Sequence, residues 1–231
     1  MRCDRFAKTV VITGTSSGVG KILSYHFKCL NWNVIEISRW PEGSIGPGNG
    51  KNSLIRLDIT NKSISGRLKN IPGLTKIDVL INNAGVFLCK PLKKCSGADL
   101  DNVIDTNLKG TINVTMACLG LMGNGSRIIN IGSVAGVHGI KHQALYCASK
   151  FGINGFFDSL SHELTPKGIL ISTINPGGID TPLWGKKNPY DGDKKKLLKP
   201  KDICEVVNYI IKLPPNVVFK NAVIHPVNEI H

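Results

Sequence analysis

The sequence has no long apolar run and no cysteine pattern typical of a metal site. None of its apolar stretches approaches the ~18 to 20 residues that span a bilayer. An apolar strand starts within a few residues of the N-terminus, which leaves little room for a signal peptide. The seven cysteines are odd in number and form no C-x-x-C pair. We therefore expect a cytoplasmic protein with reduced thiols, no membrane segment and no metal.

Acidic residues are scarce, with 16 Asp and Glu against 29 Lys and Arg, which gives a net charge of +13. Such a charge is compatible with a nucleic-acid surface, a membrane surface or an anionic small ligand. No nucleic-acid recognition motif accompanies it, so we expect no nucleic-acid partner. The basic residues are scattered apart from the run Lys186–Lys201. That run is either a solvated face or an attraction for an acidic substrate or partner.

The remaining pattern is that of one packed α/β domain over residues 1–231, because short β-branched runs alternate with longer amphipathic segments. Helices between successive strands predict a parallel sheet that is covered on both faces. A stretch of about 182–199 is expected to be a flexible substrate loop. The expected strands are Val10–Thr13, Asn33–Ser38, Leu54–Leu57, Ile77–Ile81, Arg127–Ile131, Ile169–Ile174 and Ala222–His225. The expected helices are Val19–Leu30, Leu100–Leu121, Tyr146–Leu164 and Pro200–Ile211, with a short helix within Asn61–Asn70.

A glycine-rich turn joins the first strand to the first helix. Its glycines allow a tight turn and let backbone N–H groups approach a pyrophosphate at the N-terminus of the helix. The spacing is G-x-x-x-G-x-G, which differs from the G-x-G-x-x-G of larger dinucleotide-binding folds. The residues predicted to bind the cofactor here are Gly14, Thr15, Ser16, Ser17, Gly18, Val19 and Gly20.

The end of the second strand predicts which nicotinamide cofactor is bound. An acid at this place would bond the adenosine ribose and select NAD. Ser38 and Arg39 stand there instead, and they suit the 2′-phosphate of NADP because a guanidinium can bind a phosphate bidentately. Glu36 lies on the same strand face as Ser38 and would reverse the preference if the strand slid by one pleat.

Tyr146 and Lys150 stand four residues apart at the start of a predicted helix, and therefore share one face of it. A phenol ionises near pH 10, so acid/base work at neutral pH needs a neighbouring cation to stabilise its anion. Ser133, at the end of the fifth strand, can exchange a hydrogen bond with a substrate oxygen. These three residues are candidates for proton transfer.

Together these motifs resemble the short-chain dehydrogenase/reductase family over roughly residues 8 to 228. The resemblance implies a Rossmann-like, doubly wound, seven-stranded parallel sheet with strand order 3-2-1-4-5-6-7. It also implies hydride transfer between NADP(H) and a carbonyl or secondary alcohol, and a homodimer or homotetramer. The quoted segments are Thr13–Gly20, Asp58, Asn82–Gly85, Asn107 within Thr106–Gly110, Ser133, Tyr146 with Lys150, and Pro176–Thr181.

The family's residue roles carry over position by position. Tyr146 is implied to be the acid/base, Ser133 to orient the substrate oxygen, and Asn107 to hold a water in a proton relay. Lys150 is implied to lower the tyrosine pKa and to hold the nicotinamide ribose. The further cofactor residues implied are Asp58 and Ile59 at the adenine, Asn83, Ala84 and Gly85 at the adenosine ribose, and Pro176, Gly177, Ile179 and Thr181 at the nicotinamide end.

Several points stay open in the sequence. The ending Val223–Val227 resembles that of an NADP-dependent subgroup that acts on 3-hydroxy acids and small carbonyls. Trp184 either caps the substrate or packs, while His138 and His142 either line the pocket or lie in solvent. An NADP-binding regulator without turnover is the alternative function. It would not need Asn107, Ser133, Tyr146 and Lys150 together.

Overall fold

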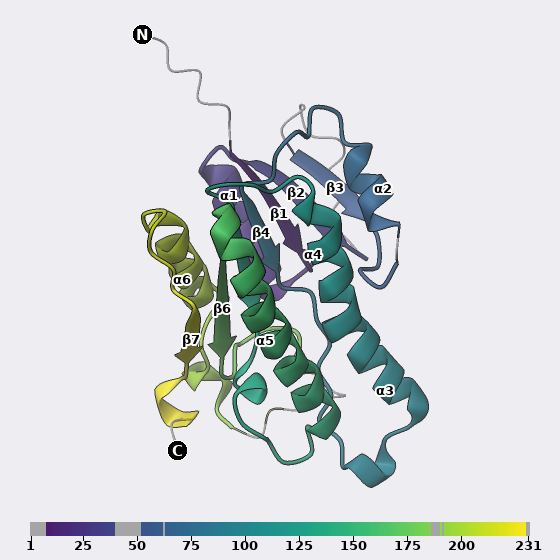
Figure 1. Cartoon of the computed structure of the whole chain (residues 1–231). Helices are drawn as coiled ribbons and strands as arrows, with labels where there is room; N and C mark the ends of the chain where they lie inside the picture. Colours follow the sequence, from purple (N-terminus) through teal and green to yellow (C-terminus); the bar gives the residue numbers. More distant parts are fainter. Residues whose placement is uncertain (1–7, 40–51, 62, 186–189, 191, 230–231) are drawn as a thin grey trace.

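A seven-stranded parallel sheet forms the centre of the computed structural model, which describes residues 8–39, 52–61, 63–185, 190 and 192–229. The strand order is β3-β2-β1-β4-β5-β6-β7, which confirms the predicted topology (Figure 1). The strands are β1 Thr9–Thr13, β2 Asn33–Ser38, β3 Asn52–Arg56, β4 Val79–Asn82, β5 Arg127–Ile131, β6 Leu170–Pro176 and β7 Asn221–Ile224.

Helices cover both faces of the sheet, and each face has its own apolar core. The helices are α1 Gly18–Cys29, α2 Ile64–Lys69, α3 Gly97–Val103, α4 Thr111–Leu119, α5 Ala144–Leu164 and α6 Pro200–Lys212. Helices α2, α4 and α5 pack over one face, where Val11, Leu80 and Ile128 are fully buried. Helices α1 and α6 pack over the other, against Val10 and Ile81. Successive residues of a buried strand point to opposite faces, which explains why the central strands are rich in apolar residues on both faces.

The predicted helix Leu100–Leu121 is present, but it starts earlier, ends at Leu119 and is not α-helical throughout. Helix α3 begins earlier, where Ser96 and Asp99 form a reciprocal capping box. A π-helical segment, Ile104–Gly110, then separates α3 from α4. Its wider turn contains Asn107, whose carbonyl accepts a hydrogen bond from Thr111 Oγ1 at 2.7 Å. Such π-segments occur often at functional sites.

Other boundaries differ by a few residues. Strand β3 begins at Asn52, ahead of the predicted Leu54, because the Asn52 side chain accepts the Val34 N–H and extends the pairing. The short helix α2 lies within the predicted range. The predicted flexible loop is only partly described, but hydrogen bonds from Asp180 to Leu198 and from Leu198 to Gly178 hold its two ends together. Within the described residues, no helix is both long and apolar enough to cross a membrane.

Candidate active site

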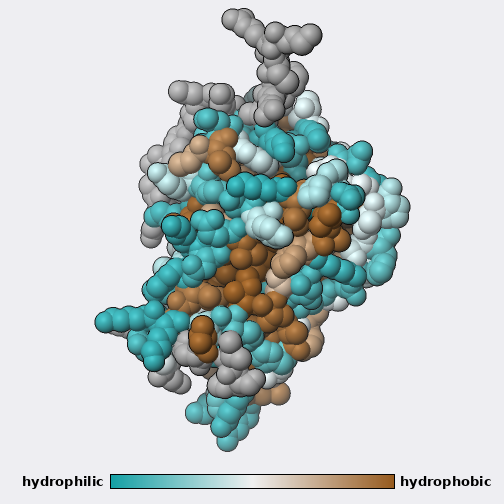
Figure 2. Space-filling model, turned by 90° about the vertical axis from the view of Figure 1, so that its left-hand side faces the viewer, coloured by the Kyte–Doolittle hydropathy of each residue, from teal (hydrophilic) through white to brown (hydrophobic). Residues whose placement is uncertain are grey.

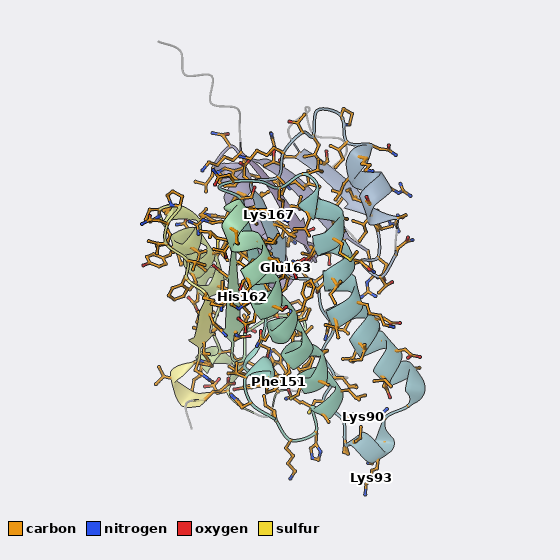
Figure 3. The ribbon with its side chains drawn as sticks, viewed as in Figure 1. Lys90, Lys93, Phe151, His162, Glu163 and Lys167 are labelled. Atoms are coloured by element: carbon orange, nitrogen blue, oxygen red, sulfur yellow. The ribbon has the colours of Figure 1, made fainter. Side chains whose placement is uncertain are left out.

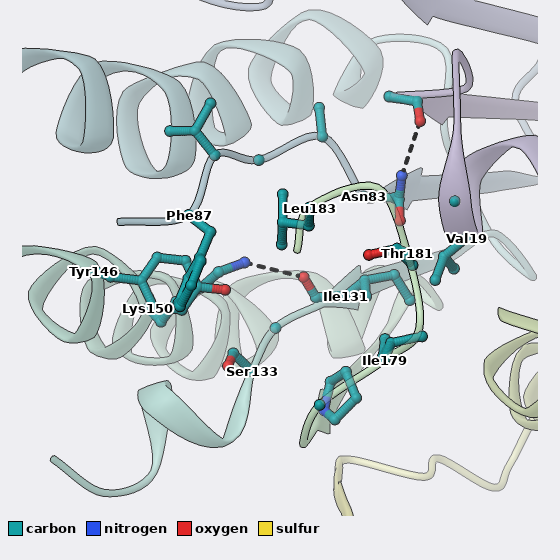
Figure 4. Close-up of a pocket in the computed structure, with 18 of the residues that line it drawn as sticks. Val19, Asn83, Phe87, Ile131, Ser133, Tyr146, Lys150, Ile179, Thr181 and Leu183 are labelled. Carbon is teal, nitrogen blue, oxygen red and sulfur yellow. Dashed lines mark hydrogen bonds between the residues drawn. The ribbon is translucent and has the colours of Figure 1, made fainter. Parts of the chain in front are cut away.

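A cleft of about 840 Å³ opens at the carboxyl ends of the strands. This is where ligands bind in open α/β sheets. Figure 4 shows part of its lining, with Tyr146 and Lys150 from α5, Ser133 after β5, and Ile179 to Leu183 from the loop after β6. Nearly all residues predicted for the site line this one cleft. The exceptions are Thr15, Gly20 and Asn107, which do not border it.

The glycine-rich turn has the backbone geometry that its sequence predicts. Gly14 and Gly18 have positive φ values of 71° and 54°, which side-chain-bearing residues rarely adopt. A Cβ at Gly20 would collide with the Gly14 carbonyl, so Gly20 serves the close packing of α1 against the turn. Thr15 is buried. The residues of this turn that line the cleft are Gly14, Ser16, Ser17, Gly18 and Val19.

The N-terminus of α1 points its first amides at the cleft. The N-cap residue Ser17 makes no side-chain capping bond, and the first turn contains no acidic residue. The free N–H groups and the positive end of the helix dipole therefore favour an anion at this place. The predicted pyrophosphate site fits this geometry.

Asn83 ties the ends of β1 and β4 together. Its Nδ2 donates to the Thr13 carbonyl at 3.0 Å and to the Gly14 carbonyl at 3.2 Å. Figure 4 shows Asn83 with one dashed hydrogen bond from its side-chain nitrogen. The backbone N–H groups of Asn83 and Ala84 donate to Thr13 Oγ1. With Gly85, these residues border the cleft. Their described contacts hold the backbone of the glycine turn in place, and so shape the cleft.

At the far end of the cleft, Ser38, Arg39, Asp58 and Ile59 come together as predicted. Arg39 is half-exposed, and its Nη1 lies 3.5 Å from the Asp58 carboxylate. Glu36 does not border the cleft. Its buried carboxylate instead accepts bonds from Ser24 Oγ at 2.6 Å and Lys28 Nζ at 2.8 Å, both on α1.

Tyr146, Ser133 and Lys150 are brought together as the sequence predicts. The phenol is buried, and the Ser133 side chain lies close enough to it to lower its pKa. Lys150 Nζ lies 5.7 Å from the centroid of the tyrosine ring and 3.4 Å from the Ile131 carbonyl. The three side chains therefore converge on one volume at the end of β5 (Figure 4).

The pKa values differ from those that the family resemblance implies. Burial raises the pKa of Tyr146 to about 12, and outweighs the influence of the Ser133 side chain, which lowers it. Burial also lowers the pKa of Lys150 to about 8. In this structure desolvation therefore dominates the electrostatics of both groups.

Asn107 does not border the cleft but supports the residues that do. Its Nδ2 donates to the Val86 carbonyl at 2.9 Å and to Ser149 Oγ at 3.1 Å, while its Oδ1 accepts the Val86 N–H at 2.8 Å. Ser149 Oγ in turn donates to the Tyr146 carbonyl at 2.7 Å. The side chain thus links the loop after β4 to the first turn of α5. Both the nitrogen and the oxygen of the Asn107 side-chain amide already make hydrogen bonds. Any water bound by Asn107 would have to share these atoms.

The loop after β6 carries the predicted nicotinamide-end residues. Pro176, Gly177, Ile179 and Thr181 all border the cleft. Gly178, which belongs to the quoted segment Pro176–Thr181, borders it too. The Trp184 indole donates to the Ile179 carbonyl at 2.8 Å, so it closes this loop on itself.

A chain of aromatic rings lies beside Tyr146, and of its members sequence reasoning named only Trp184. The Phe87 ring stands edge to face with Tyr146 at 5.0 Å and with Trp184 at 4.9 Å between centroids. Trp184 contacts Tyr190 at 5.1 Å, and the Tyr190 hydroxyl donates to Glu229 Oε1 at 2.9 Å. Phe87 stands two residues after the Asn83–Gly85 motif, which could have indicated it. Tyr190 and Glu229 carry no such local signal.

The histidines divide between the two readings that the sequence left open. His138 borders the cleft and stacks on His225, with 6.2 Å between ring centroids. His142 is exposed and does not border it. Trp184 borders the cleft and packs against Phe87, so its packing is confirmed and the capping of a substrate stays a prediction.

Comparison with known proteins decides the family. A sequence model of the short chain dehydrogenases matches residues 8–191. The chain belongs to the short-chain dehydrogenase family. It is 32% identical over 231 residues to an uncharacterized oxidoreductase of Staphylococcus saprophyticus, covering 95% of this chain and 97% of the relative. An uncharacterized oxidoreductase of Staphylococcus aureus is 29% identical over 228 residues, again with 95% and 97% covered.

Solved structures agree with this assignment. A serine dehydrogenase complexed with NADP⁺ superposes with a TM-score of 0.85 at 29% identity, covering 96% of each chain. The serine dehydrogenase from Escherichia coli gives 0.83 at 28% identity, covering 96% of this chain and all of that one. The protein is therefore an oxidoreductase of a nucleotide-binding, Rossmann-like family.

Proposed function

We propose that this protein is an NADP-dependent dehydrogenase or reductase that interconverts a carbonyl and a secondary alcohol, with Tyr146 as its acid/base. The observation that carries the proposal is one continuous cleft. It joins an uncapped helix N-terminus and Arg39 at one end to Tyr146, Ser133 and Lys150 at the other. A cofactor and a proton donor would meet there.

The residues present fit the cofactor. A Cβ at Gly14 would press on Ala84 and one at Gly18 on Thr181, so both glycines allow the turn to pack against the neighbouring loops of the cleft. The uncapped N-terminus of α1 borders the same cleft. A nicotinamide cofactor supplies the hydride when it is bound. Gly14, Ser16–Val19, Asn83–Gly85 and the loop Pro176–Thr181 would hold it, and Thr15 and Gly20 would support the turn from behind.

The protein's own work is proton transfer. In our proposal the Tyr146 hydroxyl gives its proton to the substrate oxygen during reduction, and Ser133 Oγ orients that oxygen. Lys150 holds a ribose hydroxyl and stabilises the phenolate once a charge develops there. Asn107 keeps Tyr146 and Lys150 in register through Ser149 and Val86. The raised pKa of Tyr146 keeps its proton in place until substrate arrives.

The preference for NADP rests on charge. Arg39 offers a half-exposed guanidinium beside Ser38, where an NAD enzyme would place a carboxylate. Glu36, which could have reversed the preference, is bonded to Ser24 and Lys28 and faces α1. Asp58 already pairs with Arg39, so the bound phosphate would replace or share that contact. The structural neighbour complexed with NADP⁺ is consistent with this choice.

We further propose a cytoplasmic homodimer or homotetramer. Phe157 of α5 is buried but Phe151 of the same helix is 46% exposed, and Met116 of α4 is 66% exposed. Figure 3 shows Phe151 on the outer side of α5 together with His162 and Glu163. Figure 2 views the side of α6 and β7 and shows an apolar band there. Exposed large side chains here are Tyr209 of α6, Val223 of β7 and Phe219 in the connection between them.

The test follows nicotinamide absorbance with a panel of ketones, aldehydes, 3-oxo esters and hydroxy acids, using NADP and NAD. Dissociation constants are measured by fluorescence in parallel. We expect turnover with NADP and a ten- to hundredfold tighter binding of NADP than of NAD, the size of one charge-assisted phosphate contact.

Two variants check the cofactor assignment. Arg39→Ala should weaken NADP by that factor and leave NAD nearly unchanged, and Ser38→Asp should invert the preference. NAD bound more tightly by the unmodified protein would overturn the Arg39 assignment. Tight NADP binding without turnover of any substrate would favour the regulator.

A further inference from the structure

The substrate end of the cleft carries a covering arch that begins at the catalytic tyrosine. The arch runs from Tyr146 through Phe87, Trp184 and Tyr190 to Glu229, each member in contact with the next. Glu229 closes it, because its Oε2 accepts the Gly178 N–H at 2.8 Å. The C-terminal segment is thereby joined to the loop beside the nicotinamide end.

The inner surface of this arch is apolar. Phe87 and Ile140 pack against the Tyr146 cluster, and Leu183 and Trp184 border the same part of the cleft. Figure 4 shows Leu183 and Phe87 beside Tyr146 and Lys150. A substrate whose carbonyl reaches Tyr146 must lay its neighbouring carbons against these side chains. Burying an apolar group there is favourable by about 25 cal/mol for each Å² removed from water.

Glu229 places a carboxylate at this end of the cleft, and no cation donates to it among the described contacts. The buried Lys150 lies at the same end but beside Tyr146. Both hydrogen bonds to Glu229 come from neutral donors, the Tyr190 hydroxyl and the Gly178 amide. Among the described residues that line the cleft, the single arginine is Arg39, at the opposite end. Lys141 borders the cleft from an exposed position. The bidentate guanidinium that commonly recognises a carboxylate is therefore absent from the described lining of this end.

From the arch and its carboxylate we infer that the substrate is an uncharged ketone or aldehyde with an apolar arm, and that Glu229 discriminates against substrates that carry a carboxylate. The inference rests on the proposed function and adds a substrate class to it. It also selects between the two classes that the C-terminal resemblance suggested, since it favours small carbonyls over 3-hydroxy acids. Trp184 and Phe87 favour substrates with an apolar arm, and Glu229 disfavours substrates with a negative charge.

The test compares matched pairs that differ only in charge, such as 4-oxopentanoate and its methyl ester, by kcat/KM with NADPH. We expect the ester to be preferred by about tenfold or more, the size of repulsion between like charges about 10 Å apart at an effective dielectric constant of about 20. Glu229→Gln should reduce this preference several-fold. Glu205→Gln, which removes an equal charge from an exposed site on α6, should leave it unchanged.

The apolar arm is tested separately with methyl and benzyl esters of one oxo acid. Trp184→Ala should abolish the discrimination between them, while both remain substrates. An acid preferred to its ester by the unmodified protein, or an ester preference that Glu229→Gln does not change, would overturn the inference.

Failure of the proposed function gives a different result. If NADP binds but none of these compounds is turned over, calorimetric titration of the NADP-loaded protein with the matched alcohols still decides the matter. Tighter binding of the uncharged alcohol, weakened selectively by Trp184→Ala, supports the inference. Binding of the carboxylate alone contradicts it.

Discussion

Two buried cations lie at opposite ends of strand β5. Arg127 begins the strand, and its guanidinium donates to the carbonyls of Leu213, Pro214 and Val217 just beyond α6. Lys150 lies where the strand ends and has one carbonyl, that of Ile131, at 3.4 Å. Burial lowers the pKa of both groups. The Arg127 guanidinium therefore has three backbone carbonyls as acceptors. The Lys150 ammonium has one acceptor among its described contacts, so further N–H donors can bind a ligand.

The two ends of β5 therefore differ in purpose: the buried cation at the amino end stabilises the fold, and the one at the carboxyl end lies in the candidate site. At the amino end of β5, carbonyls at the negative end of a helix stabilise a cation that does no chemistry. At the carboxyl end, an incompletely bonded ammonium lies beside a buried phenol, at a cost to stability that a ligand can offset. We expect substitutions at the two ends to have opposite effects.

Arg127→Met should give the largest effect on stability. It leaves three carbonyls without their donor, and we expect the free energy of unfolding to fall by about 3 kcal/mol. Urea denaturation measures it. Arg127→Lys, which keeps one charge but cannot reach all three acceptors, should recover part of the loss. If Arg127→Met were as stable as the unmodified protein, the contrast between the two ends would be lost.

Lys150→Met should act in the opposite sense and stabilise the cofactor-free protein by about 2 kcal/mol at pH 7, while it removes turnover. The extra stability of Lys150→Met over the unmodified protein depends on pH. Between about pH 8 and 10.5 the folded lysine is neutral while the unfolded one stays protonated, so the unmodified protein becomes more stable and the gain shrinks. The raised pKa of Tyr146 makes both proteins lose stability from about pH 10 to 12.

Denaturation curves at several pH values check the lysine variant. A loss of stability at pH 7, or a difference from the unmodified protein that stays constant up to pH 10.5, would contradict this account of Lys150.

Ser149→Ala should have the smallest effect, about 1 kcal/mol of stability, because one bond of Asn107 Nδ2 is lost while its bond to Val86 remains. We expect kcat to fall several-fold and the pH profile of kcat to shift, since Ser149 also bonds the carbonyl of Tyr146. NADP affinity should change little. Ser149→Thr, which keeps the hydroxyl, should restore the profile; a kcat unchanged in Ser149→Ala would remove the positioning role.

The sequence predicts this fold well because its information is local and repetitive. Buried strands such as β1 and β5 are apolar on both faces, and they alternate with amphipathic helices that leave one common topology. The π-segment around Asn107 could not be predicted, because one wider turn barely disturbs the apolar periodicity. Strand β3 was misplaced because a polar residue, Asn52, begins it through a side-chain bond.

The residues of the candidate site also differ in how far the sequence could predict them. Residues with motif spacing, such as Tyr146 and Lys150, were predictable because one helix turn fixes their distance. Glu229 was not, since it meets Gly178 across 51 positions of sequence and no periodicity links them. The direction of the Tyr146 pKa shift was also beyond the sequence, because it depends on how completely the fold buries the phenol.

The most direct measurement of the central claim compares unmodified protein with Tyr146→Phe, using NADPH oxidation by one carbonyl substrate and NADP dissociation constants for both. The phenolic proton serves chemistry while the ring remains to pack against Phe87. The account predicts a loss of turnover of at least about 10³-fold, with NADP affinity within about twofold. Turnover within a few-fold of the unmodified protein would contradict the assignment of Tyr146 as the acid/base.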